Sequence, residues 1–247
     1  MTSYSSIPQN DSGDCCIQNL SYVSGNRPNS LEAVPKPPGI GRVASHLHHH
    51  NETMIATVRS ELTGEMVLLS PLQLSNIYRH FEWNNDPELN RLDSELPLQE
   101  ESLGEFKKRF EELIFYPSGH SQDFELHTKD GGLIGVAEIT GISDHNHHCS
   151  VSLSICDRKF WGTGHGKDAM TVLLNYCFGE LKMHRVDASA FAYDDAWKRL
   201  VEGMGFRREG VERDYIFRDN RYFDKEIYAL LESEYQAIRP TTNGINK

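Results

Sequence analysis

The segment RKFWGTGHGKDAM, residues 158–170, holds three glycines within five residues, Gly162, Gly164 and Gly166. It follows a segment with strand character and precedes one with helical periodicity. A strand, a glycine-rich turn and a helix together direct free backbone N–H groups and a helix N-terminus at an anion. Glycines let the backbone approach a phosphate at distances that a Cβ atom would prevent. A tight strand-to-helix turn without any ligand has the same composition, so the segment alone leaves both interpretations open.

The spacing excludes two common phosphate-binding motifs. A Walker loop ends in Gly-Lys followed by Ser or Thr, whereas Gly166-Lys167 is followed by Asp168. A Rossmann fingerprint needs a third glycine at a spacing that is absent here.

The composition limits the classes of function. Hydrophobic residues make up 38% of the chain and charged residues 25%, with a net charge of −11. An acidic surface repels phosphate, so we expect no nucleic-acid partner. No apolar run reaches the ~20 residues that span a bilayer, and no secretory signal is recognisable, so we expect no membrane association. The odd number of cysteines predicts reduced thiols in the cytoplasm; these are Cys15, Cys16, Cys149, Cys156 and Cys177.

The chain divides into regions of different character. Residues 1–55 are rich in serine, contain a histidine run at 46–50 and have few large apolar residues. Such a segment buries too little surface to offset its ordering entropy, so we expect a flexible arm. Docking of this arm on the globular part or on a second subunit is the alternative, which leaves a homodimer open. We expect the folded domain over residues 56–237 and a short tail over 238–247.

Apolar periodicity predicts the main elements of that domain. The hairpin signal KDGG separates two of the strands, and serines alternate with Val151, Leu153 and Ile155 in the third. We expect helices over 72–92 (broken near 84–87), over 102–116 and from Lys167 onward, and strands at 65–72, 123–128, 132–142, 150–156 and 185–193.

The chain beyond the glycine loop resembles a known family. The segments that carry the likeness are WGTGHG (161–166), ELKMHRV (180–186), GMGFRREGVERDYIFRDNRYFD (203–224) and LLESEY (230–235). They are similar to the GNAT superfamily of acyl-CoA-dependent N-acetyltransferases, and within it to the ribosomal-protein-alanine and spermidine N-acetyltransferases. FEWNNDPELNRL (81–92) looks like the acceptor-side helices of that branch. The likeness covers roughly residues 61–235, in the family's order of elements.

The resemblance implies an α/β (α+β) fold, a mixed twisted sheet of about six or seven strands flanked by about four helices. The strands at 150–156 and 185–193 would splay into a V-shaped cleft. It also implies acetyl-CoA as co-substrate, with its pyrophosphate on the loop amides and its pantetheine arm along the strand before the loop. Carried over by position, the cofactor-binding residues are Leu153, Ile155, Trp161, Gly162, Thr163, Gly164, His165, Gly166, Lys167, Asp194 and Lys198.

Several positions depart from the family's pattern. Asp194 stands where an Asn usually bonds the pantetheine, and Val201 stands where many members have a Tyr that protonates the departing thiolate. Trp197 and Lys198 replace a small residue and an apolar one. Aminolysis of a thioester needs a base, whereas the thiol leaves readily without an acid. The missing Tyr therefore weakens the prediction of catalysis without removing it.

The candidate bases are Glu138, in mid-strand, and His148. An outward-facing strand residue explains Glu138 equally well. The sequence HNHHC (145–149) has metal-ligating residue types, but solvated loop histidines explain it better, and we expect no metal. Acidic groups would suit a cationic amine on the acceptor side, where Asp93 lies; the residues predicted to bind substrate there are Glu82, Trp83 and Asn85.

The sequence therefore predicts an N-acetyltransferase that moves acetyl from acetyl-CoA to a primary amine by direct attack in a ternary complex. The acceptor could be a protein N-terminus, a polyamine or an amino sugar. A degenerate acyl-CoA-binding or scaffold module is the alternative from another class, and transfer of a different acyl group stays open.

Overall fold

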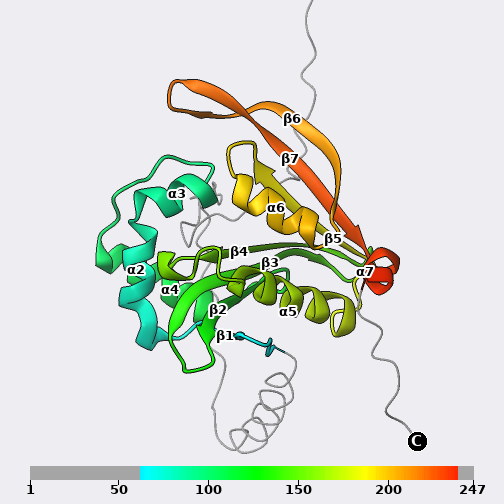
Figure 1. Ribbon diagram of the computed structural model, residues 1–247. Coiled ribbons are helices and arrows are strands. Elements are labelled where there is room, and N and C mark those ends of the chain that lie inside the picture. The colour runs from blue at the N-terminus through cyan, green and yellow to red at the C-terminus, as the bar shows by residue number, and fades with distance from the viewer. Residues whose placement is uncertain (1–61, 239–247) are drawn as a thin grey trace, which may run out of the picture.

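The computed structural model describes residues 62–238. Its centre is one mixed seven-stranded sheet in the order β1-β2-β3-β4-β5-β7-β6 (Figure 1). The strands are β1 (Val67–Pro71), β2 (Gln122–Thr128), β3 (Leu133–Ser143), β4 (His148–Ile155), β5 (Arg185–Phe191), β6 (Arg207–Arg218) and β7 (Arg221–Leu231). The helices are α2 (Ile77–Asn84), α3 (Pro87–Asp93), α4 (Leu103–Phe115), α5 (His165–Gly179), α6 (Asp195–Gly203) and α7 (Glu232–Ile238), with 3-10 turns η1 (Leu74–Asn76) and η2 (Arg158–Phe160).

The pairing between β4 and β5 is parallel and short. It joins His148–Ser150 to Arg185–Asp187, while every other neighbouring pair is antiparallel. Beyond this point β4 runs on to Ile155 along β3, and β5 runs on to Phe191 along β7. The two strands therefore splay apart in the middle of the sheet, as the predicted V-shaped cleft requires.

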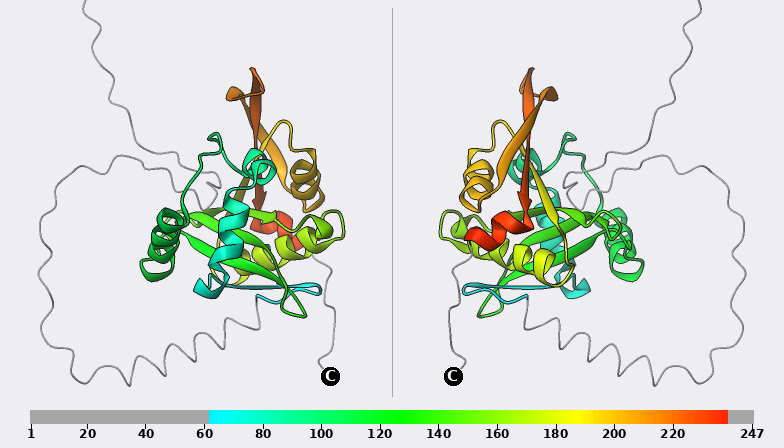
Figure 2. Two further views of the ribbon diagram at one scale, coloured as in Figure 1. Left: turned by 90° about the vertical axis from the view of Figure 1, so that its left-hand side faces the viewer. Right: turned by 90° about the vertical axis from the view of Figure 1, so that its right-hand side faces the viewer.

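Different helices cover the two faces of the sheet (Figure 2). On one face α5 buries Leu173 and Cys177 in the main core, against apolar residues of β1 to β5. On the other face α2 and α4 pack on each other through Phe106 and Phe110, and α3 reaches the ends of β3 and β4 through Leu89. The splay thus opens between an apolar layer that contains α5 and a layer that consists of α2, α3 and α4.

The observed elements match the predicted ones except at their ends. The helix expected over 72–92 begins with η1 and is divided between α2 and α3, because Asp86 caps α3. The Asp86 carboxylate accepts from the N–H groups of Glu88 and Leu89, and Pro87 takes the first helical position, where no N–H is needed. Seven strands agree with the expectation, and six helices exceed the four or so expected, because α3 and α7 are separate short helices.

The expected arm (1–55) and all but the first residue of the expected tail (238–247) lie outside the described residues, so these boundaries stay predictions. Within residues 62–238, no helix combines the length and the apolar character needed to cross a membrane.

Strands β6 and β7 form a long hairpin that projects beyond the rest of the sheet toward α3 (Figure 1). Its turn is Asp219-Asn220, with φ values of 50° and 60°. Positive φ at both central residues gives a turn whose twist matches that of the flanking strands, and Asp and Asn tolerate this conformation.

A buried carboxylate fastens α2 and its preceding turn to β2. Glu125 is fully buried and accepts hydrogen bonds from His80 Nε2 and His127 Nε2, both at 2.9 Å. The Asn76 amide and the Gln73 N–H donate to it at 2.7 and 2.9 Å. Burial alone would raise the pKa of Glu125, but the donors lower that pKa to about 2, and the bond to Glu125 raises the pKa of His127.

We expect Glu125→Gln to lower the free energy of unfolding by about 3 kcal/mol at pH 6, because it leaves buried donors around a neutral group. The carboxylate contributes stability above its unfolded pKa near 4.3, and His127 contributes below its unfolded pKa near 6.5. The difference from the parent should therefore be largest between about pH 4.5 and 6.5 and shrink at higher pH. Urea unfolding across pH measures it, with Glu112→Gln, at an exposed position of α4, as the control; a pH-independent difference would contradict the charged network.

Candidate active site

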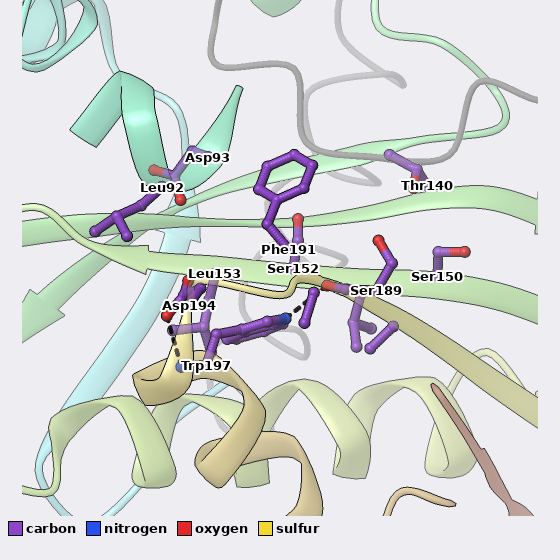
Figure 3. A pocket seen from close by; sticks show the side chains of 13 residues that line it. Leu92, Asp93, Thr140, Ser150, Ser152, Leu153, Ser189, Phe191, Asp194 and Trp197 are labelled. Carbon is purple, nitrogen blue, oxygen red and sulfur yellow. Dashed lines mark hydrogen bonds between the residues drawn. The ribbon is translucent and has the colours of Figure 1, made fainter. Parts of the chain in front are cut away.

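A pocket lies where β4 and β5 splay apart (Figure 3). Because side chains alternate along a strand, the gap between the two strands is bordered from both faces of the sheet. Its lining residues are Leu92, Asp93, Thr140, Ser150, Val151, Ser152, Leu153, Ala188, Ser189, Ala190, Phe191, Asp194 and Trp197.

The pocket has two chemically different halves. On the α5 side, the strands present Val151, Leu153, Ala188 and Ala190, which belong to the main core. On the opposite side, they present mostly polar side chains, with Asp93 of α3 and Thr140 of β3 beside them (Figure 3). A ligand that passes through the sheet here would meet an apolar wall at one end and polar groups at the other.

The glycine loop follows β4 after the short turn η2 and leads into α5. Gly162 has a φ of 71° and Gly164 a φ of 96°, values that residues with a Cβ atom rarely adopt. No side chain caps α5 at Gly164, so the N–H groups of its first turn point out of the helix without a capping partner. Gly166 has a different role, because a Cβ there would lie 3.8 Å from both Ile155 and Leu200. The loop geometry suits an anion, with the helix dipole adding to the attraction.

The loop's own side chains are ordered by short hydrogen bonds. The Thr163 hydroxyl donates to Phe160 O at 2.6 Å and lies 2.8 Å from Nδ1 of His165. Since the hydroxyl has one proton, His165 Nδ1 must donate, which leaves Nε2 as the free ring nitrogen. The Trp161 indole N–H donates to Ile155 O at 2.5 Å. One backbone acceptor expected to line the pantetheine arm is thus already bonded.

The first turn of α5 also holds the start of β1. The Asp168 carboxylate accepts from the N–H groups of Glu65, Met66 and Val67 at 2.7–3.0 Å. It is therefore a structural group and not one that competes for an anion at the loop. Lys167, by contrast, is exposed beside the loop.

Two carboxyl groups line the pocket. Burial raises the pKa of Asp93 to about 7, against a hydrogen bond from Ser154, and the charge of Asp194 raises it further. Asp194 caps α6 by accepting from Trp197 N–H at 2.9 Å, and burial raises its pKa. The sequence predicts Asp93 only as one of several acidic groups on the acceptor side. Its contact with the end of β4 is a tertiary feature that no spacing in the sequence reveals.

The predicted bases lie outside the pocket lining. Glu138 is on β3, opposite Ser152 of β4 on one side and Asp123 of β2 on the other. Burial, with the charge of Asp123, raises the pKa of Glu138 to about 8. His148 begins β4, four residues from Ser152 and so about 13 Å along the strand. Glu138 therefore lies one strand away from the polar half, opposite its lining residue Ser152. His148, in contrast, lies where β4 and β5 are still paired.

The residues predicted to bind substrate are held elsewhere. Trp83 is buried in a cluster with Leu89, below the Arg79 guanidinium. Glu82 pairs with Arg79 at 2.9 Å, and the Asn85 amide donates to Phe81 O at 2.9 Å. None of the three predicted residues lines the pocket; the following helix, α3, supplies Leu92 and Asp93 instead.

The departures on α6 have structural consequences. Val201 is fully buried in the main core, so the place of the usual Tyr offers no room for a phenol. Lys198 donates to Ala192 O at 2.7 Å and pairs with Asp195 at 3.0 Å, which fixes its ammonium at the start of the helix. Trp197 lies in the cleft, and its indole N–H donates to Ser189 O of β5 at 2.7 Å.

The hairpin β6–β7 holds the end of α3 from across the pocket. Arg218 donates to the carbonyl oxygens of Arg91 and Ser94, which caps α3. Glu95, just beyond the helix, accepts from the Lys225 ammonium at 2.9 Å and from the Tyr215 hydroxyl at 2.8 Å. These contacts join segments 120 or more residues apart in the chain and position Asp93, and the sequence carries no signal for them.

The histidine-rich turn does not gather metal ligands. Cys149 is buried in the main core, and His148 precedes it on a strand, so their side chains point to opposite faces of the sheet. In residues 62–238, no group of three or more His, Cys, Asp or Glu side chains is placed to hold a metal ion.

Comparison with known proteins decides the family. Residues 67–207, more than half of the chain, match the family model of the acetyltransferase (GNAT) domain. The chain belongs to the GNAT acetyltransferase family. This membership confirms the resemblance and the fold, and it indicates that the chain is an N-acetyltransferase.

Individual relatives of this GNAT chain are distant. It is 23% identical over 176 residues to the uncharacterized N-acetyltransferase p20 of Bacillus licheniformis, covering 70% of this chain and 97% of that protein. It is 27% identical over 123 residues to the [ribosomal protein uS5]-alanine N-acetyltransferase of Escherichia coli, covering 49% of this chain and 63% of the relative. The crystal structure of spermidine N-acetyltransferase from Vibrio cholerae in complex with CoA and spermine matches with a TM-score of 0.63 at 20% identity, covering 69% and 98% of the two chains.

We expect Gly164→Ala to weaken acetyl-CoA binding by about 5- to 30-fold. A Cβ atom in the left-handed region costs about 1–2 kcal/mol, which the loop can relieve only by leaving the conformation seen here. Isothermal titration calorimetry measures the affinity. Gly179→Ala, at the other end of α5 with open space around it, is the matched control and should bind normally. Equal affinities would show that the loop is only a turn.

Proposed function

We propose that this chain transfers an acetyl group from acetyl-CoA to a primary amine, in the cytoplasm, by direct attack in a ternary complex. One observation carries the proposal: the pocket passes through the sheet at the splay, with the glycine loop and α5 on one face and Asp93 on the other. The two substrates would thus approach the same gap from opposite faces. The family membership supports the reaction class.

The residues present fit acetyl-CoA. The uncapped first turn of α5 and the positive-φ glycines Gly162 and Gly164 form a cradle for the pyrophosphate. Leu153 and Asp194 would border the pantetheine arm between β4 and α6. When bound, the thioester supplies an activated acetyl group. The sequence assigns Lys198 and Trp161 to cofactor binding as well. Their polar side-chain groups are already bonded to the protein, so these two residues carry less of the proposal.

Asp93 is the proton acceptor in this proposal. The ammonium group of the acceptor gives its proton to the carboxylate, and the free amine then attacks the thioester carbonyl. A C–N bond forms, the C–S bond breaks, and the thiolate leaves with the electron pair. The amide nitrogen loses its second proton to solvent, and the thiolate takes a proton from solvent, so that the step releases one proton overall. A base with a pKa near the working pH is effective in this step. Glu138, the base expected from the sequence, is retained as the competing candidate, whereas His148 lies at the closed end of the splay.

The acceptor class follows from the polar half of the pocket. Asp93 with Ser150, Ser152 and Thr140 offers acidic and hydroxyl groups that suit a cationic amine. The named activities of two relatives, on a ribosomal-protein alanine and on spermidine, support both a protein N-terminus and a polyamine. Thiol release from acetyl-CoA, measured against peptide N-termini, polyamines and amino sugars, tests the proposal and separates these acceptors.

A catalytically degenerate acyl-CoA-binding module is the second candidate. The buried Val201 in place of the usual acid favours it. Such a module would bind acetyl-CoA by calorimetry and release no thiol with any amine of the panel. An enzyme would release thiol with at least one.

We expect Asp93→Asn to lower kcat/KM by about 10²- to 10⁴-fold while acetyl-CoA affinity is kept, because the isosteric amide cannot accept the proton. In the parent, kcat/KM should rise with pH through about 7, the pKa of Asp93, and level off above it. Glu138→Gln is the matched comparison. If Glu138 is the base, that variant loses activity instead, and the parent's profile has its midpoint near pH 8.

The same variant should be more stable than the parent at high pH. The pKa of Asp93 is about 7 in the folded chain and near 3.9 when unfolded, so ionising it in place opposes folding. That loss of stability grows as pH rises from about 4 to about 7 and is constant above. The Tm of Asp93→Asn, minus that of the parent, should follow this course. Asp144→Asn, on an exposed turn, should give a flat difference, and a flat difference for Asp93→Asn would show that its carboxyl is not perturbed.

A further inference from the structure

The apolar half of the pocket is closed by one large side chain. Four of its members, Val151, Leu153, Ala188 and Ala190, are aliphatic residues of the splayed strands, and two of these are alanines. Trp197 of α6 is the large one. It packs against the main core and lies across the gap on the α5 side, opposite Asp93 and Phe191 (Figure 3). The size of the Trp197 indole therefore limits the depth of the apolar half of the pocket.

Trp197 is held at both ends. Its indole N–H donates to Ser189 O at 2.7 Å, and its backbone N–H donates to the Asp194 carboxylate at 2.9 Å. The first bond satisfies a carbonyl of β5 beyond the last residue paired with β4, Asp187. Releasing the indole would leave that carbonyl without its partner, which costs about 1–3 kcal/mol where water is excluded. The indole is thus a fixed wall of the pocket.

The division of the pocket decides which substrate group meets this wall. A cationic amine belongs in the half that contains Asp93 and the hydroxyl groups, because a charge is strongly disfavoured among aliphatic side chains. The carbon chain of an acyl group belongs in the other half, where its burial is favourable. The acyl carbonyl then lies between the two, within the splay, where attack by the amine takes place.

We propose, resting on the acetyl transfer proposed above, that Trp197 limits the acyl group to a short chain such as acetyl. Longer acyl groups would extend toward the indole and collide with it. The small side chains of Ala188 and Ala190 leave room for the methyl group of acetyl, and Trp197 ends that room. Trp197 is thus a residue that determines specificity for the acyl donor and takes no part in proton transfer.

The test compares kcat/KM for acetyl-, butyryl- and hexanoyl-CoA with one amine that the parent uses. The parent should prefer acetyl. Trp197→Ala should raise the ratio of butyryl to acetyl roughly tenfold, the effect of burying two further methylene groups at about 0.8 kcal/mol each. Trp197→Phe keeps an aromatic ring and loses the indole N–H, so it should change the ratio little. Trp197→Leu, intermediate in size, replaces the alanine variant if that variant does not fold.

Three results would overturn the proposal. The first is an unchanged ratio in folded Trp197→Ala or Trp197→Leu, and the second is an equal rise in Trp197→Phe. The third is a similar gain in affinity of Trp197→Ala for all three acyl-CoA esters and for CoA itself, which would place the indole in the path of the pantetheine arm. Dissociation constants of the three esters from calorimetry show, without turnover, whether Trp197→Ala gains affinity for the longer acyl groups relative to acetyl-CoA. A parent that acylates no amine would therefore refute the proposed function while the role of Trp197 is still decided.

Discussion

The site depends on the early end of the β4–β5 pairing. Parallel strands that stay paired leave no opening, whereas here three residues of each strand pair and the rest diverge. Divergence exposes backbone groups in the middle of the sheet, where they need partners. Two tryptophans provide them: Trp161 donates to Ile155 O on β4, and Trp197 donates to Ser189 O on β5. The remaining space is the pocket.

The buried Glu125 and the partly buried Asp93 differ in the number of hydrogen-bond donors that each carboxyl group receives, and this difference separates a structural group from a reactive one. Glu125 receives four hydrogen bonds, its pKa is about 2, and it fastens helices to the sheet. Asp93 has one donor, Ser154, and a negative neighbour, so its pKa is about 7. A carboxylate with few donors is costly to keep ionised, and the same cost makes it responsive to a proton near neutral pH. The fold thus stabilises the ionised form of Glu125, whereas it leaves Asp93 able to exchange a proton near neutral pH.

The position of Asp93 relies on a distant part of the chain. Helix α3 has seven residues, too few to be stable alone. Arg218 bonds its last carbonyl oxygens, and Glu95 beyond it is bonded by Lys225 and Tyr215 of the hairpin. The β6–β7 hairpin therefore belongs to the site although it contributes no residue to the pocket lining.

The amino-acid sequence by itself determined the elements, the family and the loop. Alternation in β4, the apolar stripe of α5 and the glycines at 162, 164 and 166 are local patterns, and local patterns follow from backbone geometry alone. The positive φ values of Gly162 and Gly164 agree with what those glycines imply. The tertiary structure decided which side chains face the pocket. Asp93, Phe191 and Trp197 come from three elements, and their meeting depends on how far two strands splay and on ion pairs across more than 120 residues. No spacing along the chain encodes those distances, because they arise only when the elements pack.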